Sequence, residues 1–555
     1  MITSLAVLLT VFRIAVVPVQ FQDCAFTCEE SQLKAITDKA GTYLNDQFHG
    51  KYDFSFELLS PVTLPKPTAW YGENTTSMHD VNIIQALEDA CRMKDTDVDF
   101  SEYDNDGDGK VDAVVLLTAG MSESDGAGDE KIWPQQGWLH DSNAVFSLDG
   151  VDIDGFMVVT ELKSDLGANP RISGPGTLCH EFLHILGAKD LYDTDGEQSG
   201  GLGSPMWKSL FIMDEGNGND DGNTPPNLGA VELEMLNIGI ADTLDAGRFI
   251  LEPIGRNGRY IRTRNGKRGD YYLFECREQS GWDSAIGGKG LLITHIDKTR
   301  PTWYDKWAAN QINCNPGHPG AGIIAANPEA KDVSEVFFPQ PGHNSFSSDT
   351  NPPFVYWDGR KSLLALTDIK LQSDGSISFT VLEPIKLGEI IAFQDAAMVN
   401  WTLTGVPAGS SCHLEWYCEG EEPQSADVRG SAYTIEHLKP RTGYTLTITV
   451  SSGSGETWSV TTNFKTKTYN NQIYPYIYLR ESDRNEDRSF KSGTRIPLRI
   501  FNALDAGHID WFYNGIPIST GADGCFPLTS DGQLKAIVYH ADGTMDIIVK
   551  QIVVR

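Results

Sequence analysis

The sequence predicts a multidomain protein in which an α/β (α+β) domain is followed by two all-β sandwich domains. Three observations support this prediction. The chain has 555 residues, too many for one hydrophobic core. Patterns typical of strands and of helices alternate up to about residue 120, whereas short alternating strands dominate from residue 385 onward. The abundant glycines fit loop-rich β modules. The predicted domains comprise residues 1–384, 385–468 and 469–555.

The first predicted domain opens with strands and helices in turn. Residues 13–23 are apolar and typical of a buried strand, and residues 31–48 have the apolar spacing of a helix. The same reasoning predicts a strand at 54–58, an amphipathic helix at 80–93 and a buried strand at 113–118. These elements together predict helices packed on a sheet.

The stretch GTLCHEFLHILGAKDLY contains the residue types and spacing of a catalytic metal site. His180, Glu181 and His184 form an H-E-x-x-H pattern. Residues four apart on a helix lie on one face about 6 Å apart, so both imidazoles can bind one ion while Glu181 acts on a water molecule. Gly187 can end the helix, because glycine adopts positive φ at little cost, and the turn would bring Asp190 to the same ion. The sequence therefore predicts a catalytic zinc site with ligands His180, His184 and Asp190.

The full string G-x-x-x-H-E-x-x-H-x-x-G-x-x-D-L-Y-D resembles the immune inhibitor A family of secreted bacterial metallopeptidases, a metzincin-like group. Further motifs follow in the family's order: DLYDTDG, LFIMDEGNG, TPPNLGAVELEMLNIG, YYLFECREQSGWD and GKGLLITHID. The resemblance covers about residues 12–384. It implies a metzincin-like zinc peptidase domain, protein or peptide substrates and a secreted or cell-surface location. The family's inhibitory pro-segment is missing from the sequence, so we expect a mature or truncated form.

The third zinc ligand has several candidates. Many metzincins carry histidine where Asp190 stands, but an aspartate can replace it with a Zn–O bond of about 2.0–2.2 Å. Glu232, on a predicted helix in GAVELEML, is the alternative third ligand. Glu234 on the same helix is a similar carboxylate, and Glu275 and His295 are more remote candidates.

Two methionines could lie beneath the metal. In metzincins a methionine in a turn forms an apolar floor under the metal site, and Met213 in LFIMDEGNG resembles it. Met206 in SPMW is the competitor. We expect a packing role for either side chain, because a thioether is a soft apolar group. Cys179 is expected to be a small buried residue, although a ligand role stays open.

The segment YDNDGDGKVDAVV has the alternating acids of a calcium loop. Val115 stands where a complete EF-hand has a bidentate glutamate, so the sequence predicts a reduced structural calcium site. An acidic, solvated turn is the alternative. The predicted ligands are Asp104, Asp106, Asp108, the Lys110 carbonyl and Asp112.

A second group of acids follows the zinc helix. It consists of Asp190, Asp193, Asp195 and Glu197. It could hold another calcium ion or orient the Asp190 carboxylate, and both can hold at once.

The acidic composition limits the partners. With 44 basic and 76 acidic residues the formal net charge is −32, which argues against nucleic acid or an anionic membrane. No segment is apolar and long enough to span a bilayer. Residues 2–12 are apolar but lack the basic region and cleavage site of a signal peptide, so Met1 is read as an internal or truncated start. The nine cysteines show no regular disulfide framework.

The region 385–468 resembles a fibronectin type III domain. Trp401, Trp416 and the strand pattern of LKPRTGYTLTITV carry the resemblance, and Tyr444 stands where that family has its corner tyrosine. Spacer or stabilising duty is expected of this module, with glycan or surface contact left open.

The region 469–555 resembles an immunoglobulin-like sandwich joined by a linker at 469–474. Its strands are GTRIPLRIFNA, HIDWFYNGIPI, GQLKAIVYHADG and MDIIVKQIVVR. Trp511 is the expected core tryptophan, and Asn514 with Gly515 is expected to form a hairpin turn.

The functional prediction is a secreted zinc endopeptidase in which Glu181 serves as general base and then general acid. Two alternatives stay open. One is a zinc hydrolase of another class, an esterase or amidase, and the other is a catalytically silent adhesin on a peptidase-like scaffold.

Overall fold

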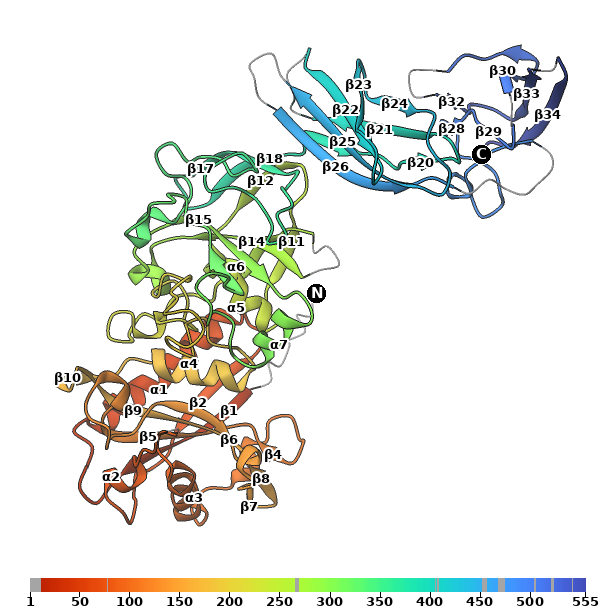
Figure 1. Ribbon diagram of the computed structural model, residues 1–555. Coiled ribbons are helices and arrows are strands. Elements are labelled where there is room, and N and C mark those ends of the chain that lie inside the picture. Colours follow the sequence, from red (N-terminus) through yellow and green to blue (C-terminus); the bar gives the residue numbers. More distant parts are fainter. Residues whose placement is uncertain are drawn as a thin grey trace, which may run out of the picture. The chain divides into compact units, whose positions relative to one another are not determined.

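The computed structural model describes residues 11–76, 78–264, 269–404, 406, 409–451, 457–467, 475–503, 506–520, 524–541 and 543–555. The chain forms two compact units, coloured red to green and green to blue in Figure 1. Unit 1 comprises Met1–Ser362 and Leu366–Val381, and unit 2 comprises Leu363–Ala365 and Leu382–Arg555. The expected division into three domains stays a prediction, and the linker expected at 469–474 lies outside the described residues.

A seven-stranded sheet forms the first layer of unit 1. Its strands are β1 (Val11–Gln20), β2 (Asp53–Leu58), β3 (Val62–Thr63), β5 (Val114–Met121), β6 (Gln135–Trp138), β9 (Gly155–Asp165) and β10 (Ala168–Ile172). Their order is β10-β9-β5-β1-β2, with β3 paired to β1 and β6 to β9. The pairs of β1 with β2 and β5, and of β5 with β9, are parallel, whereas β6 and β10 run antiparallel to β9.

Helices cover both faces of this sheet (Figure 1). They are α1 (Glu30–Gln47), α2 (Thr68–Tyr71), α3 (Ile83–Lys94) and α4 (Gly176–Ile185). Residues Ile14 and Val16 of β1 face the core with α1 and α4, while Ala15 and Val17 face the core with α2 and α3. The side chains of a strand alternate between faces, so a central strand covered on both sides is apolar throughout. The strands and helices predicted between residues 13 and 118 are confirmed, with ends shifted by a few residues.

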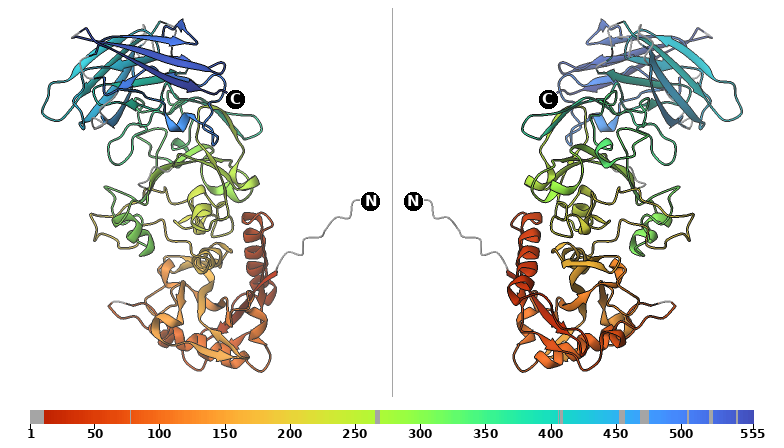
Figure 2. Two further views of the ribbon diagram at one scale, coloured as in Figure 1. Left: turned by 90° about the vertical axis from the view of Figure 1, so that its right-hand side faces the viewer. Right: turned by 90° about the vertical axis from the view of Figure 1, so that its left-hand side faces the viewer.

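A second sheet lies on the far side of α4 in unit 1. Its strands, in the order β11-β13-β14-β15-β16, are Ile240–Thr243, Arg259–Arg262, Asp270–Arg277, Gly290–Asp297 and Ala321–Ile323. Leu273 and Leu292 from this sheet belong to the same hydrophobic cluster as α4 and the first sheet. In both views of Figure 2 the first sheet, red to orange, gathers at one end of unit 1. Helix α4, which carries the H-E-x-x-H pattern, is therefore part of a core shared by two sheets.

Short elements complete unit 1. The helices are α5 (Ala230–Met235), α6 (Ile254–Asn257) and α7 (Thr302–Ala308). One small sheet joins β4 (Lys110–Val111), β8 (Val151–Ile153) and β7 (Phe146–Leu148), and another joins β12 (Gly247–Leu251), β18 (Ile377–Leu382) and β17 (Ala365–Leu371). No described helix is both long and apolar enough to cross a membrane.

The strands described in unit 2 form several small antiparallel sheets. The first group is β19 (Ile385–Leu387), β20 (Ile391–Ala392), β21 (Ala397–Leu403), β22 (Ser411–Tyr417), β23 (Gln424–Val428), β24 (Ala432–Ile435), β25 (Gly443–Ser451) and β26 (Thr457–Lys465). The second group is β27 (Tyr476–Ile477), β28 (Arg495–Pro497), β29 (Ile500–Phe501), β30 (Ala506–Tyr513), β31 (Ile516–Pro517), β32 (Cys525–Pro527), β33 (Gly532–His540) and β34 (Met545–Ile552). The four-stranded sheets β23-β22-β25-β26 and β31-β30-β33-β34 are the most extended.

Unit 2 contains three tryptophans and one tyrosine for which the sequence predicts core or corner positions. Trp401 and Trp416 are buried in one cluster, and the hydroxyl of the buried Tyr444 accepts a 2.9 Å hydrogen bond from the Lys439 N–H. Trp511 differs from its expectation as a core residue, because it is only partly buried at the edge of a second cluster.

The turn at Asn514 and Gly515 is as expected, with φ angles of 51° and 80° between β30 and β31. The predicted mixture of helices and sheets is confirmed for the chain as a whole. The metzincin-like, fibronectin type III and immunoglobulin-like assignments stay predictions.

Candidate metal centre

Helix α4 carries the H-E-x-x-H pattern and is anchored by its apolar face. Leu178, Phe182 and Leu183 are buried between the two sheets. The chain approaches closely at the start of the helix: a Cβ atom on Gly176 would lie 1.9 Å from the carbonyl oxygen of Asn217, so only glycine fits. The apolar face and this contact fix which way the histidines point.

The turn after α4 brings Asp190 back to the helix. Gly187 has a φ of 100°, a conformation that favours glycine and that the sequence predicted here. The Oδ1 atom of Asp190 then lies 3.3 Å from His180 Nε2 and 3.2 Å from His184 Nε2. The two Nε2 atoms are 3.2 Å apart. The structure thus brings together three side chains that the sequence predicts as zinc ligands.

These three atoms form a nearly equilateral triangle that fits a zinc ion. Ligand atoms at bonds of about 2.0–2.2 Å in tetrahedral geometry lie about 3.3 Å from each other. Asp190 Oδ1 is also buried without a hydrogen-bond partner among the described residues. A buried, unpaired carboxylate oxygen is costly unless a cation or donor meets it. The donor set, two imidazoles and one carboxylate, is the one that catalytic zinc sites use.

Backbone carbonyls orient both imidazoles. His180 Nδ1 lies 2.7 Å from the carbonyl oxygen of Ile212, and His184 Nδ1 lies 3.0 Å from that of Ala188. A carbonyl oxygen only accepts, so each Nδ1 carries the hydrogen and each Nε2 offers its lone pair to the centre of the triangle. This is the arrangement that holds metal-binding histidines in place.

The charge balance favours an ionised aspartate at the centre. Burial alone would raise the pKa of Asp190, but in the metal-free protein the two imidazoles, when protonated, hold that pKa well below its ordinary value. Asp190 can therefore act as an anionic ligand.

Glu181 lies beside the triangle and lines a cavity of about 950 Å³. Burial raises the pKa of its carboxyl group, and the two imidazoles partly oppose that rise. A carboxylate with a raised pKa accepts a proton more readily. The cavity wall also includes Trp133, Thr160, Lys163, Tyr192, Asp214 and Asn217.

The turn that contains Met213 forms hydrogen bonds with both segments that carry the proposed ligands. The carbonyl of Ile212 meets His180, and the carbonyl of Met213 accepts a 2.7 Å hydrogen bond from the Leu191 N–H. The side chains of Met213 and Met206 are both completely buried. The backbone of this turn thus supports the helix and the aspartate loop, while the expected floor role of the Met213 side chain stays a prediction.

Glu232 lies outside the triangle. It is completely buried, and its carboxylate oxygens accept hydrogen bonds from the Met213 N–H at 2.9 Å and the Gly229 N–H at 2.7 Å. Burial raises the pKa of Glu232 to about 7, and these two N–H groups oppose the rise. In this structure Glu232 holds the 212–213 turn, which is a supporting position and not that of a third ligand.

The remaining ligand candidates are also engaged away from the triangle. Glu234 pairs with Arg262 at 2.8 Å, and His295 pairs with Asp270 at 2.7 Å. Glu275 pairs with Arg277. Of the carboxylates considered from the sequence, Asp190 is the one that meets both histidines.

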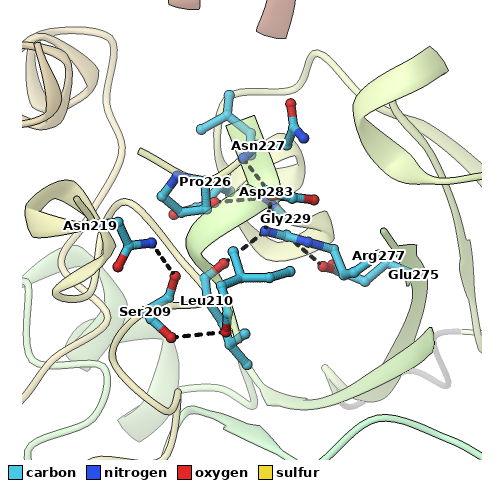
Figure 3. A network of polar contacts seen from close by, with 12 residues as sticks. Ser209, Leu210, Asn219, Pro226, Asn227, Gly229, Glu275, Arg277 and Asp283 are labelled. Atoms are coloured by element: carbon cyan, nitrogen blue, oxygen red, sulfur yellow. Dashed lines mark hydrogen bonds and ion pairs between the residues drawn. The ribbon is translucent and has the colours of Figure 1, made fainter. Parts of the chain in front are cut away.

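A buried cation supports the segment that precedes this turn (Figure 3). The guanidinium of Arg277 donates to Glu275 at 3.0 Å, to Asp283 at 2.9 Å and to the carbonyl of Leu210 at 3.0 Å. Asp283 also accepts a 2.8 Å hydrogen bond from the Asn227 N–H. Arg277 is completely buried, so the network fixes the chain at Leu210 from inside the core.

The predicted calcium loop brings together three of its five candidates. Carboxylate oxygens of Asp104, Asp106 and Asp108 lie within 4.8 Å of one another. Asp104 also accepts hydrogen bonds from the N–H groups of Gly107 at 2.8 Å, Asp108 at 3.1 Å and Gly109 at 3.0 Å. These contacts hold the turn by themselves, as the acidic-turn alternative expects.

The other two calcium candidates are placed differently. The Asp112 carboxylate accepts hydrogen bonds from the backbone N–H and from the side-chain Nδ2 of Asn105, each at 2.8 Å, and is not part of the acidic group. Lys110 lies in β4, paired with Asp152 of β8. The calcium site therefore stays a prediction.

The second acidic group is smaller than expected and includes a cysteine. Asp193 and Asp195 lie with Cys314 within 4.8 Å, whereas Glu197 is not part of the group. Asp193 accepts hydrogen bonds of 3.1 Å from the N–H groups of Asp195 and Gly203. The carboxylates thus shape the loop after Asp190.

Tyr192, within the DLYD motif, lines the cavity. Two further residues at the site carry no motif in the sequence: Cys314 and Asn310 contact the loop after α4 from more than a hundred residues away. Single residues far along the chain leave no spacing pattern, so the fold alone reveals them. Cys179 is completely buried, with its Sγ 3.9 Å from the carbonyl of Ala40, as a packing residue would be.

Comparison with known proteins supports the resemblance seen in the sequence. Residues 17–240 match the family model described as "Immune inhibitor A peptidase M6, catalytic domain". The predicted resemblance to the immune inhibitor A family is confirmed for this segment. The segment contains α4, Asp190, Met213 and Glu232.

A curated relative agrees with this match. The chain is 26% identical over 218 residues to "Immune inhibitor A" of Bacillus thuringiensis subsp. alesti. The match covers 35% of this chain and 31% of that protein, so the chain spans about a third of the length of the curated relative it matches.

Solved structures with similarity include two fibronectin type III domains. One is from human fibronectin type III domain containing protein 3, with 20% identity, TM-score 0.14 and coverage of 15% of this chain and 84% of that chain. The other is from human collagen alpha-1(XX) chain, with 21% identity, TM-score 0.15 and coverage of 16% and 86%. Likenesses with such TM-scores carry no argument about the fold.

Proposed function

We propose that this protein is a secreted zinc-dependent endopeptidase with His180, His184 and Asp190 as zinc ligands. The observation that supports it best is the triangle of two Nε2 atoms and one unpaired carboxylate oxygen, with edges of 3.2 and 3.3 Å. The match to a peptidase catalytic-domain family supports the same reaction class. The secreted location rests on the family resemblance.

Each residue of the site has a role in this proposal. His180, His184 and Asp190 would hold a zinc ion that, when bound, would polarise a peptide carbonyl and lower the pKa of water. Glu181 accepts the proton of the attacking water and then donates it to the leaving amine. The carbonyls of Ile212 and Ala188 keep the imidazole hydrogens on Nδ1. Each imidazole therefore stays in the tautomer whose Nε2 lone pair can bind the metal.

The cavity beside Glu181 is the proposed substrate site. Its volume of about 950 Å³ leaves room for side chains of a peptide but also lies within the range of small-molecule sites. Protein or peptide substrates are proposed because the matched family is a peptidase, and a small ester is the alternative that the metal chemistry alone would allow. Spacer duty, or contact with a glycan or surface, is proposed for unit 2.

The test is hydrolysis of an unfolded protein by the wild type and by Glu181→Gln, with zinc content measured in both. We expect the wild type to cleave, and the variant to bind zinc with activity lower by about 10²–10⁴-fold, because a general base contributes that much. Glu329→Gln, an exposed glutamate in the same unit, is the matched control and should retain full activity. A zinc-loaded wild type that leaves proteins and varied peptides intact would contradict the peptidase proposal and favour another hydrolase or an adhesin.

A further inference from the structure

Asn310 holds Asp190 through two reciprocal hydrogen bonds. The Asn310 Nδ2 donates to Asp190 Oδ2 at 2.7 Å, and the Asp190 N–H donates to Asn310 Oδ1 at 2.7 Å. One carboxamide therefore fixes both the backbone and the carboxylate of the same residue. Asn310 lies outside the segment that matches the peptidase family.

The chain around Asn310 contacts the aspartate loop at further points. The Thr194 hydroxyl donates to the Asn310 carbonyl at 2.7 Å. The Nδ2 of Asn313, a completely buried residue, donates to the Leu191 carbonyl at 2.7 Å. These contacts place the 310–313 segment directly against the loop that begins at Asp190.

The two oxygens of Asp190 consequently differ. Oδ2 is taken by Asn310, whereas Oδ1 has no hydrogen-bond partner in the part of the chain that the structure describes and lies 3.2–3.3 Å from the two histidine Nε2 atoms. A free carboxylate could bind a metal through either oxygen or through both. With Oδ2 engaged and the backbone held, Oδ1 alone is offered, and a position stays open for substrate or water.

We propose that Asn310 is a positioning residue that makes Asp190 a zinc ligand through Oδ1 alone. This inference rests on the proposed zinc site. Support from outside the ligand set orients ligands and tunes affinity in metal sites generally. Here that support comes from the turn just after α7, in a part of the chain beyond the peptidase match.

The backbone of Asn310 defines the cleanest variant. Its φ of 58° is left-handed, which asparagine and glycine tolerate better than other residues. Asn310→Gly therefore removes the carboxamide without backbone strain. Asn143→Gly is the matched control, because Asn143 is exposed in the same unit and has a φ of 51°.

The first measurement is the zinc dissociation constant, by competition with a chromogenic chelator, for wild type and both variants. We expect Asn310→Gly to bind zinc about 10–100-fold more weakly than wild type, and Asn143→Gly to match wild type. Equal zinc affinity in the two variants would overturn the proposal. A wild type without zinc affinity would instead contradict the proposed function.

The second measurement is the visible spectrum of the cobalt(II)-loaded proteins, which reports coordination number independently of activity. Wild type and Asn143→Gly should show the intense bands of four-coordinate cobalt. Asn310→Gly should show weaker, shifted bands as the second oxygen of Asp190 joins the metal. Thermal melting of the metal-free proteins completes the test: a variant that does not fold, or that melts much earlier without metal while its cobalt spectrum stays unchanged, would overturn the proposal in favour of a structural role.

Discussion

His180 Nδ1 donates a 2.7 Å hydrogen bond to the carbonyl oxygen of Ile212, 32 residues further along the chain. The backbone N–H of the next residue, Met213, donates a hydrogen bond to the carboxylate of Glu232. The orientation of a proposed ligand therefore depends on a buried carboxylate that does not touch the metal centre. This relationship separates residues that should bind zinc from residues that should hold the fold.

Asp190 and Glu232 should behave differently when they are replaced. Asp190→Ala removes a proposed ligand, so the purified variant should lose most of its zinc while keeping its fold. Glu232→Gln should keep its zinc but lower the free energy of unfolding by about 1–3 kcal/mol, because an amide N–H₂ then faces backbone N–H donors. The zinc content and the thermal unfolding of both variants are measured and compared with those of the wild type. Full zinc occupancy in Asp190→Ala would exclude Asp190 as the third ligand.

Arg277 should be among the most sensitive positions in unit 1. Arg277→Met leaves Glu275 and Asp283 buried without their cation, which should cost about 3–5 kcal/mol. Arg92→Met, which breaks an exposed pair with Glu88 on α3, should cost less than about 1 kcal/mol. Thermal unfolding of both variants against wild type measures the difference, and equal shifts would show that the buried network is dispensable.

Asp80 should make stability depend on pH. Burial, with the nearby charge of Glu123 adding to it, raises the pKa of Asp80 from 3.8 to about 7, although the Trp133 N–H, His79 and Gln135 oppose the rise. The folded protein then holds a proton that the unfolded chain has released, so this contribution to stability falls as pH rises from about 4 to about 7.

The comparison is between Asp80→Asn and the exposed control Asp129→Asn, melted at pH 5 and at pH 8. Asp80→Asn should gain stability relative to the control at pH 8 and lose that advantage at pH 5. An equal response of the two variants at both pH values would show that Asp80 is not the group responsible.

Calcium should stabilise the 104–112 loop if the sequence prediction for it is right. Calcium added to the calcium-depleted, zinc-loaded protein should raise the melting temperature, and the triple variant Asp104→Asn, Asp106→Asn, Asp108→Asn should not respond. The hydrogen bonds from Gly107 and Gly109 to Asp104 already hold this turn, so an unchanged melting temperature in the wild type would favour the acidic-turn alternative.

The sequence predicted local features better than distant ones. Gly187 could be assigned to a turn, and residues 31–48 to a helix, because neighbouring residues determine both. Asn310 and Cys314 contact residues far away in the chain, and no spacing pattern marks them. For Trp511 the residue type alone was misleading. Tryptophan favours burial, but Trp511 packs against the edge of a cluster and stays partly exposed.

The shared core around α4 has a consequence for heat inactivation. Both sheets of unit 1 contribute to the cluster that buries Leu178, Phe182 and Leu183. The proposed metal-binding helix therefore cannot detach while the sheets stay folded, since detachment would expose the apolar centre of the unit. Loss of function on heating should be an all-or-none event for unit 1, without a folded and inactive intermediate that has lost only its helix.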